Sequence, residues 1–440
     1  MRQARQFNAA ANSRINPMTH FSHKGGVLHA EDVSIPAIAA EIGTPFYCYS
    51  SAALTDRYTA LDTALARAGL DDTQICYAVK ANASLAVIAT LAQAGAGADI
   101  VSEGELRRAL AAGVAPDKIL FSGVGKTEAE ITAALDAGIA QFNVESVAEL
   151  ETLAALAQAH GTTAKVGLRV NPDIAAGGHE KISTGIAESK FGIAWDEATD
   201  TFARAAALDG IEARGLAVHI GSQISDLGLF RAAFSKIAEL LATLRAAGHN
   251  VTHLDVGGGL GVAETPDAPP PDLDGYAAAI AETLGDSGCR IWLEPGRVIA
   301  AEAGILVASV IRSKRGQGKN FVVVDAAMTE LIRPTLYDAH HPIRPVVERQ
   351  DAPETLWDIV GPVCESGDFL GLAQPLPELE SGDLLAIHAA GAYGAVLGSS
   401  YNSRRLAPEV LVEGARFALT RPRPDYAAQL AAERMPDWLT

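Results

Sequence analysis

The sequence has few cysteines, no long hydrophobic run and a deficit of positive charge, and each shortage excludes a class of protein. Its four cysteines are scattered through 440 residues without a CxxC pair, which argues against a disulfide framework or a zinc ribbon and favours a reducing compartment. No apolar run approaches the ~20 residues that cross a bilayer, and no signal-peptide core follows the amino terminus, so we expect a cytoplasmic protein with no membrane partner. The 35 basic residues against 53 acidic ones give a net charge of −18, which disfavours nucleic-acid binding.

What the sequence does contain is a regular alternation from about residue 73 onward. Short apolar or β-branched runs alternate with Ala/Leu/Glu-rich stretches of helical period. Eight runs, each followed by a helical stretch, predict an α/β fold with a (β/α)8 TIM barrel, although an open doubly wound sheet would show the same alternation. The predicted strands cover residues 74–79, 98–101, 118–121, 141–144, 164–170, 216–220, 253–256 and 290–293.

The pattern changes after about residue 295, where strand-like runs are separated by Gly/Pro/Asp turns and few helices. This pattern is typical of a mainly β second domain, which we expect to be a β-sandwich or barrel-like. The runs cover residues 305–311, 320–324, 354–360, 384–387 and 413–420. We therefore predict an N-terminal arm (1–44) that contributes to the β domain, a cofactor-binding barrel (45–300) and a C-terminal β domain (301–440).

Polar residues stand where the predicted barrel strands end, and catalytic residues of such barrels lie at the carboxyl ends of the strands. The residues in these positions are Lys80, Asp99, Ser122, Glu145, Arg169, Asn171, His219, Asp255 and Glu294. A lysine amine directly after the first strand can form a Schiff base with an aldehyde cofactor. Three glycines after the seventh strand permit a phosphate to approach the backbone, and a carboxylate after the eighth can pair with a protonated ring nitrogen. Together these features point to pyridoxal phosphate, and we expect no metal.

The sequence also contains motifs that, in this order and spacing, resemble one family. They are YAVKAN (77–82), HIGSQ (219–223), GGG (257–259), EPGR (294–297), RPTLYDAHH (333–341), CESGD (364–368) and GAYG (391–394). On these residues the chain resembles the diaminopimelate decarboxylase family, which belongs to the alanine-racemase-like class of pyridoxal-phosphate enzymes (group IV decarboxylases). The resemblance covers almost the whole chain.

The resemblance implies a role for each matching residue. Lys80 would carry the cofactor, His219 would stack on its ring and Glu294 would pair with its ring nitrogen, while Cys364 would act as the general acid that returns a proton to the substrate carbon. The other cofactor-binding residues would be Ser222, Gly257, Gly258, Gly259, Gly296, Arg297 and Tyr393. The substrate would contact Arg297, Arg333, Tyr337, Glu365 and Tyr393. The resemblance further implies that Cys364 and Glu365 come from a second subunit, so that the active site is shared across a homodimer.

The resemblance implies decarboxylation of meso-2,6-diaminopimelate to L-lysine and CO2, the last step of lysine biosynthesis. The far end of this small amino-acid substrate carries an ammonium and a carboxylate, which need an anion and guanidinium groups respectively. Three alternatives stay open. A sister decarboxylase would act on ornithine, arginine or carboxynorspermidine. A non-catalytic pyridoxal-phosphate carrier would be expected to have lost Cys364 or the arginines, and a barrel hydrolase using Asp99 and Glu145 explains neither the glycines nor Lys80.

Overall fold

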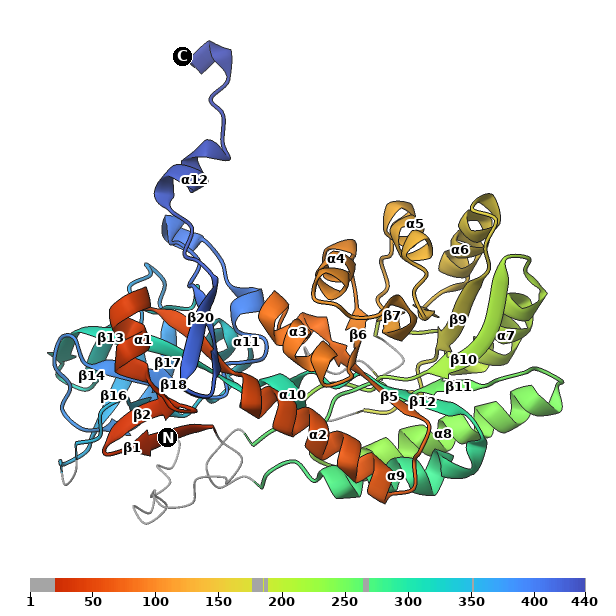
Figure 1. The fold of residues 1–440 in the computed structure, drawn as a ribbon, viewed down its shortest axis with the longest axis horizontal. Helices are drawn as coiled ribbons and strands as arrows, with labels where there is room; N and C mark the ends of the chain where they lie inside the picture. Colours follow the sequence, from red (N-terminus) through yellow and green to blue (C-terminus); the bar gives the residue numbers. More distant parts are fainter. Residues whose placement is uncertain (1–19, 176–184, 186–188, 264–268, 350–351, 440) are drawn as a thin grey trace.

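The computed structural model describes residues 20–439 apart from 176–184, 186–188, 264–268 and 350–351. Two bodies lie side by side, one built of strands surrounded by helices and the other rich in strands, and the C-terminal segment projects away from both (Figure 1). Among the described residues, no helix combines the length and the apolar character needed to cross a membrane.

The first body is a closed barrel of eight parallel strands in the order β10-β11-β12-β5-β6-β7-β8-β9. Closure is made by β12 against β5, where Leu293 lies opposite Ile75. The prediction of a barrel is thereby confirmed over the open sheet. The strands are β5 (Thr73–Ala78), β6 (Gly97–Ile100), β7 (Ile119–Phe121), β8 (Gln141–Val144), β9 (Ala164–Arg169), β10 (Ile211–Ala217), β11 (His253–Asp255) and β12 (Arg290–Leu293).

Helices follow the strands, and several begin at a side chain placed to cap them. Ser102 and Ser146 accept hydrogen bonds from backbone N–H groups of the helices that they precede, and Thr127 forms a capping box with Glu130. Gly138 ends α5 in the left-handed conformation, at φ 66°. The helices of this body are α2 (Ser51–Arg67), α3 (Leu85–Gln93), α4 (Glu103–Ala111), α5 (Glu128–Ala137), α6 (Val147–Ala159), α7 (Ala198–Ala207), α8 (Leu227–Ala246), α9 (Leu273–Leu284) and α10 (Arg297–Ala300).

The second body is a nine-stranded mixed sheet, whose main path runs β17-β16-β14-β13-β4-β19-β20 while β18 pairs with both β13 and β15. Its strands are β4 (Phe46–Ser50), β13 (Gly304–Arg315), β14 (Asn320–Val324), β15 (Ile343–Pro345), β16 (Thr355–Val360), β17 (Phe369–Leu376), β18 (Leu384–Ile387), β19 (Glu409–Glu413) and β20 (Arg416–Arg421). The remaining elements are β1 (Phe21–Lys24), β2 (Val27–Ala30), β3 (Val33–Ser34), α1 (Ile35–Ile42), α11 (Arg333–Tyr337) and α12 (Tyr426–Ala431).

The N-terminal strand β4 lies inside this sheet, antiparallel to β13 and parallel to β19. The chain therefore crosses the β-rich body before it enters the barrel and returns to it afterwards. The bounds of the three segments predicted from the sequence, 1–44, 45–300 and 301–440, stay a prediction, and residues 1–19 lie outside the described part of the chain.

The predicted strand at residues 413–420 is confirmed only in part, because β20 covers Arg416–Arg421 and Glu413 belongs to a different strand. The structure has a hairpin there, in which β19 ends at Glu413 and β20 begins at Arg416, with Gly414 at φ +59° in the turn. Apolar residues alternate on both sides of the turn, so the sequence pattern did not show where one strand ends and the next begins. Strand β17 was not predicted; it lies at the edge of the sheet and contains Gly371 and Pro375.

A small apolar cluster of Cys76, Leu120, Ala140 and Trp292 fills the amino-terminal end of the barrel interior. Burial raises the pKa of the Cys76 thiol well above its ordinary value, so this cysteine packs as a neutral side chain. The cluster fills the interior at the end where the strands begin, and polar side chains occupy the end where the strands finish.

Candidate active site

Lys80 and Asp99 form an ion pair at the mouth of the barrel, with 2.8 Å between Nζ and Oδ2. Lys80 stands in the single helical turn after β5, and Asp99 is fully buried in β6. Burial lowers the pKa of Lys80, but the charges of Asp99 and Glu294 outweigh burial and raise it above its ordinary value. The amine is therefore held in place by a carboxylate that has no contact with solvent.

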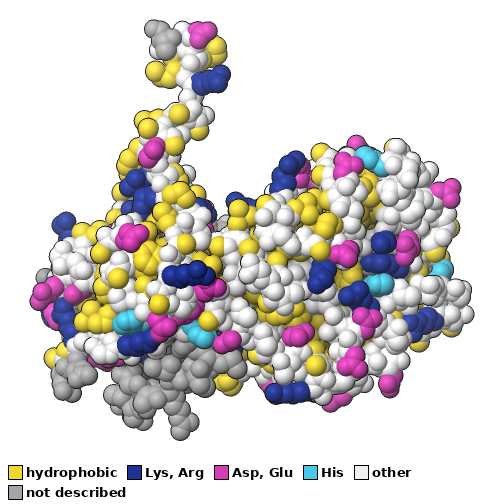
Figure 2. Space-filling view, viewed as in Figure 1, with side chains coloured by type: hydrophobic (Ala, Val, Ile, Leu, Met, Phe, Trp, Pro, Cys, Tyr) yellow, Lys and Arg dark blue, Asp and Glu magenta, His cyan; other side chains and the backbone are white. Residues whose placement is uncertain are grey.

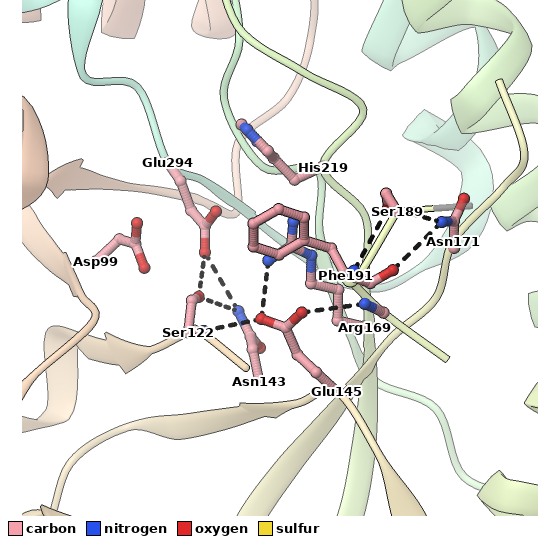
Figure 3. A network of polar contacts seen from close by, with 12 residues as sticks. Asp99, Ser122, Asn143, Glu145, Arg169, Asn171, Ser189, Phe191, His219 and Glu294 are labelled. Carbon is pink, nitrogen blue, oxygen red and sulfur yellow. Dashed lines mark hydrogen bonds and ion pairs between the residues drawn. The ribbon is translucent and has the colours of Figure 1, made fainter. Parts of the chain in front are cut away.

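Glu294, directly after β12, lies in a buried network with Ser122 and Asn143 (Figure 3). Asp255 joins this network through its contact with Asn143. Ser122 Oγ donates to Glu294 Oε1 at 2.9 Å. The amide nitrogen of Asn143 lies 2.7 Å from Asp255 Oδ2, 3.2 Å from Glu294 Oε1 and 3.1 Å from Ser122 Oγ. One amide thus joins two carboxyl groups that come from neighbouring strands.

The two buried carboxyl groups cannot both ionise without a high cost. Burial, with the charges of Asp255 and Asp99, raises the pKa of Glu294 well above its ordinary value. Burial also raises the pKa of Asp255, to about 6. The pair therefore holds a proton that a nearby base can share.

His219 follows β10 and is kept uncharged. Burial lowers the pKa of its imidazole well below the ordinary value, and the cations Arg169 and Lys80 lower it further. Its Nδ1 accepts a hydrogen bond from the backbone N–H of Gly258 at 3.2 Å, which fixes the orientation of the ring. A neutral, flat imidazole at the barrel mouth is suited to stacking on another ring.

The three glycines after β11 form a loop in which no side chain fits. A Cβ atom on Gly257 would lie 2.3 Å from the carbonyl oxygen of Val218, and one on Gly258 would lie 2.2 Å from that of Glu294. Gly259, at φ +108°, would bring a Cβ to 2.4 Å from the carbonyl oxygen of Gly221. The backbone of this loop therefore packs directly against the loops after β10 and β12.

Arg297, nearly buried at the start of α10, connects the barrel to the second body. Its Nη2 donates to Ser222 Oγ at 3.1 Å, and its guanidinium lies over the ring of Tyr393, with Cζ 4.7 Å from the centroid. Tyr393 has a positive φ of 54° and its N–H donates to Ala81 O, one residue after Lys80. Arg297, Ser222 and Tyr393, which were predicted to bind cofactor or substrate, are thus in contact close to the helical turn that carries Lys80.

Arg333 and Tyr337 lie on the short helix α11 in the second body. Nη1 of Arg333 lies 2.9 Å from Nε2 of His341, and Nδ1 of His341 lies 2.9 Å from the carbonyl oxygen of His388. Burial and the Arg333 charge lower the pKa of His341 to about 3, so the imidazole is neutral and accepts the arginine N–H. The sequence analysis assigned no function to His341, although it stands within the RPTLYDAHH motif.

Cys364 and Glu365 are exposed, in the loop between β16 and β17. The backbone N–H of Cys364 donates to Asn402 Oδ1 at 3.2 Å, and Glu365 Oε1 accepts from Gly367 N at 3.4 Å. Within the described residues, no hydrogen bond or ion pair joins either side chain to Lys80 or Glu294. Their contacts in the described part of the chain are therefore local to this loop and to Asn402.

Three further residues of the site were not predicted. Asn143 could have been found, because Gln141 and Asn143 are polar at alternate positions of β8 and so face the barrel interior together. For His341, the only indication in the sequence was its position within the RPTLYDAHH motif. Phe191, whose ring lies 4.9 Å from the Arg169 guanidinium at the mouth of the barrel (Figure 3), had no signal in the sequence.

The pair of carboxylates that a barrel hydrolase would need is not formed. Asp99 is paired with Lys80, whereas Glu145 accepts hydrogen bonds from Arg169 Nη1 at 2.9 Å and from the backbone of Gly123 and Gly192 at 2.8 and 3.0 Å. Each carboxylate is neutralised by its own cation. The site is instead suited to pyridoxal phosphate, because an amine, a glycine loop without room for side chains and a buried carboxyl group share one end of the barrel.

Comparisons with known proteins agree with this geometry. Residues 52–301 match the family described as pyridoxal-dependent decarboxylase, pyridoxal binding domain. The chain is 46% identical to the diaminopimelate decarboxylase of Zymomonas mobilis, over 96% of this chain and 100% of that one. It is 47% identical to the Pseudomonas aeruginosa diaminopimelate decarboxylase, over 95% and 99%. The crystal structure of diaminopimelate decarboxylase from M. jannaschii in complex with L-lysine is 33% identical and superposes with a TM-score of 0.91, covering 96% and 99% of the two chains. The chain therefore belongs to the diaminopimelate decarboxylase family of pyridoxal-dependent carboxy-lyases.

Proposed function

We propose that this chain decarboxylates meso-2,6-diaminopimelate to L-lysine and CO2. The observation that carries the proposal is near-complete coverage at 46% identity to a curated diaminopimelate decarboxylase, combined with the amine, glycine loop and carboxyl group at one barrel end. When bound, pyridoxal phosphate supplies an electron-accepting ring that stabilises the charge left on the substrate carbon as CO2 departs.

In this proposal, each polar residue at the barrel mouth contacts a different part of the cofactor. Lys80 supplies the amine at which the cofactor attaches, and Asp99 keeps that amine directed into the site. Glu294 would share a proton with the ring nitrogen, since Ser122 and Asn143 bond only its Oε1 and its carboxyl group is buried. His219 would stack on the cofactor ring without adding a charge there, because burial keeps its imidazole neutral by lowering its pKa.

The phosphate is assigned to the glycine loop and the polar groups around it. Gly257, Gly258 and Gly259 offer backbone N–H groups without obstructing side chains. Ser222 and Tyr393 both contact Arg297, and we assign their hydroxyl groups to the phosphate as well. Gly296 is needed beside the lysine turn, since a Cβ there would lie 3.0 Å from Cβ of Ala81.

The far end of the substrate requires both signs of charge, and the chain has groups of both signs. Arg333 is oriented by neutral His341, which leaves the guanidinium positive and suited to a carboxylate fork. Arg297 and the hydroxyl groups of Tyr337 and Tyr393 complete the carboxylate side in this proposal, and Glu365 faces the substrate ammonium.

We further propose that the working unit is a homodimer in which Cys364 and Glu365 of one copy complete the site of the other. Cys364 is the acid that returns a proton to the substrate carbon. Two observations support the shared site. Both residues are exposed in the single chain, and the projecting C-terminal arm carries exposed apolar side chains (Figure 2), among them Tyr426, Leu430 and Trp438.

The test is an assay of purified protein with meso-diaminopimelate, ornithine and arginine side by side, following CO2 release and the amine product. Lysine formed from meso-diaminopimelate, with the other two substrates at least about a hundredfold slower in kcat/KM, is the expected result. Faster turnover of ornithine or arginine would assign the chain to a sister decarboxylase. Cofactor binding without turnover of any substrate would indicate a carrier.

A further inference from the structure

A cavity of about 200 Å³ lies at the end of the barrel opposite the candidate active site. All eight barrel strands are parallel, so the residues that begin them share one end and the residues that end them share the other. The cavity is lined at the beginnings of β9 to β12 and in the turn before β7, by Asp117, Lys165, Arg214, His253, Arg290 and Trp292.

Cations dominate the polar lining. Lys165, Arg214 and Arg290 face one acidic lining residue, Asp117. Two further carboxylates lie outside the lining: Asp72 has Oδ1 3.4 Å from Nε of Arg290, and Glu212 acts on Arg214 through its charge.

The pKa of His253 is shifted by the charged groups around this cavity. Burial lowers its pKa to about 4, and every charged group that contributes to the shift, Arg214, Arg290 and Lys165, is a cation. The cations therefore outnumber the carboxylates around this imidazole, although the net charge of the chain is −18.

The centre of the lining is the indole of Trp292, which is 2% exposed. The guanidinium carbons of Arg214 and Arg290 lie 5.6 and 5.9 Å from its ring centroid, and His253 meets it edge-on. Two buried N–H groups of these residues, Trp292 Nε1 and Arg290 Nε, make no hydrogen bond among the described residues. Arg290 Nε lies 3.4 Å from Asp72 Oδ1 as an ion pair, without hydrogen-bond geometry. A buried donor without a hydrogen bond is unfavourable, so these N–H groups would gain from an acceptor bound in the cavity.

We propose that this cavity is a binding site for a compact oxyanion, either inorganic phosphate or a small carboxylate. An oxyanion would balance the excess of three cations over one carboxylate in the lining, and guanidinium groups match its oxygens in a fork. The volume decides the size of the ligand: a water fills about 30 Å³, so the cavity holds an ion of a few heavy atoms with some water and excludes a nucleotide. The site does not use the residues of the proposed reaction.

Arg214 also connects this site to the barrel interior. Its Nε donates to Gln141 Oε1 at 3.2 Å and its Nη2 to the carbonyl oxygen of Ala140 at 2.8 Å. Gln141 Nε2 in turn donates to Asn143 Oδ1 at 3.0 Å. Two of the five N–H groups of Arg214 are thus bound to the barrel, which fixes the guanidinium at the cavity wall.

The experiment is calorimetric titration of the holoenzyme with inorganic phosphate and, separately, with acetate. The holoenzyme is used because, in the function proposed above, its cofactor phosphate occupies the glycine loop and leaves this cavity as the site under test. The variants are Arg214→Gln and Arg290→Gln; the second is partly exposed, with 40% of its side chain accessible, so it tests the site even where the first fails to fold. Arg231→Gln is the matched control, because Arg231 is an exposed arginine paired with Glu282 on α9.

Saturable binding of either anion to wild type and to Arg231→Gln, weakened about tenfold or more in Arg290→Gln, is the expected result. Bound anion should also change the tryptophan fluorescence, and Trp292→Phe should abolish that change. No saturable binding of either anion to the wild-type holoenzyme, or binding of equal strength in Arg290→Gln, would overturn the proposal.

Discussion

The side-chain amide of Asn143 donates a hydrogen bond of 3.2 Å to Oε1 of Glu294. The same nitrogen lies 2.7 Å from Asp255, so the orientation of Glu294 depends on an amide in the middle of the barrel. Because all three side chains are buried, the acidity of Glu294 is set by neighbours that do not touch solvent.

Replacing Asn143 by leucine should destabilise the protein and weaken cofactor binding. The substitution leaves two buried carboxyl groups without their shared donor, at a cost of about 1–3 kcal/mol for each unsatisfied group. Urea unfolding measures the loss, and the long-wavelength absorbance of the bound cofactor measures its environment. Ser122→Ala removes a donor to Glu294 alone and is expected to cost less. Equal stability of Asn143→Leu and wild type would contradict the network.

Gly258→Ala should weaken the binding of pyridoxal phosphate. The new Cβ would lie 2.2 Å from the carbonyl oxygen of Glu294, so the loop or the end of β12 must move. Dissociation constants of the cofactor, measured by absorbance titration, should rise by about tenfold or more. Gly125→Ala is the control, because nothing lies within 4 Å of a Cβ at that position. A similar change in both variants would show that the effect is general destabilisation.

Borohydride reduction of the holoenzyme should fix the cofactor on Lys80. Its amine is the one that lies beside Asp99 at the barrel mouth, at 2.8 Å. Peptide mapping by mass spectrometry locates the modified lysine. Modification of a different lysine would remove Lys80 from its proposed role, whatever the substrate of the enzyme.

Mixing two inactive variants should restore activity if the site is shared. Lys80→Ala alone should be inactive, and Cys364→Ala alone should bind cofactor normally but turn over about 10²–10⁴-fold more slowly. In an equal mixture that exchanges subunits, about half of the dimers are mixed and each has one intact site, so about a quarter of the sites recover. The recovery is measured by comparing steady-state rates before and after subunit exchange. No recovery, in a mixture shown to contain mixed dimers, would place Cys364 in the same chain as its Lys80.

His341 should make the protein less stable as the pH falls. Its pKa is lowered to about 3 in the folded chain, against an ordinary value of 6.5, so below pH ~6.5 the unfolded chain binds a proton that the folded one does not. Its contribution is fully present above pH ~6.5 and is lost toward pH ~3, by up to ~1.4 kcal/mol per pH unit. The unfolding free energy of His341→Gln should have a shallower pH slope in this range. Parallel curves for the variant and wild type would contradict this prediction.

The sequence predicted the barrel well because the evidence for it is local. Each strand such as β6 or β8 is a short buried run followed by a capped helix, and both features are set by residues within one turn or one strand. The second body was predicted less well because its sheet joins distant parts of the chain. Strand β4 lies beside β19, more than 300 residues later, and no local pattern signals that pairing.

The sequence by itself determined which residues carry polar chemistry and at which end of the barrel they stand. Lys80, His219 and Glu294 follow strands, and parallel strands end on one face. Only the tertiary structure decided which of these groups meet. Closing β12 onto β5 joins residues about two hundred positions apart, and it is this closure that buries Glu294 among Asn143, Ser122 and Asp255. Burial and proximity set the charge of each group, and neither can be read from spacing along the chain. The same closure gathers Arg214, Arg290 and Trp292 at the other end of the barrel, where the sequence indicated no site.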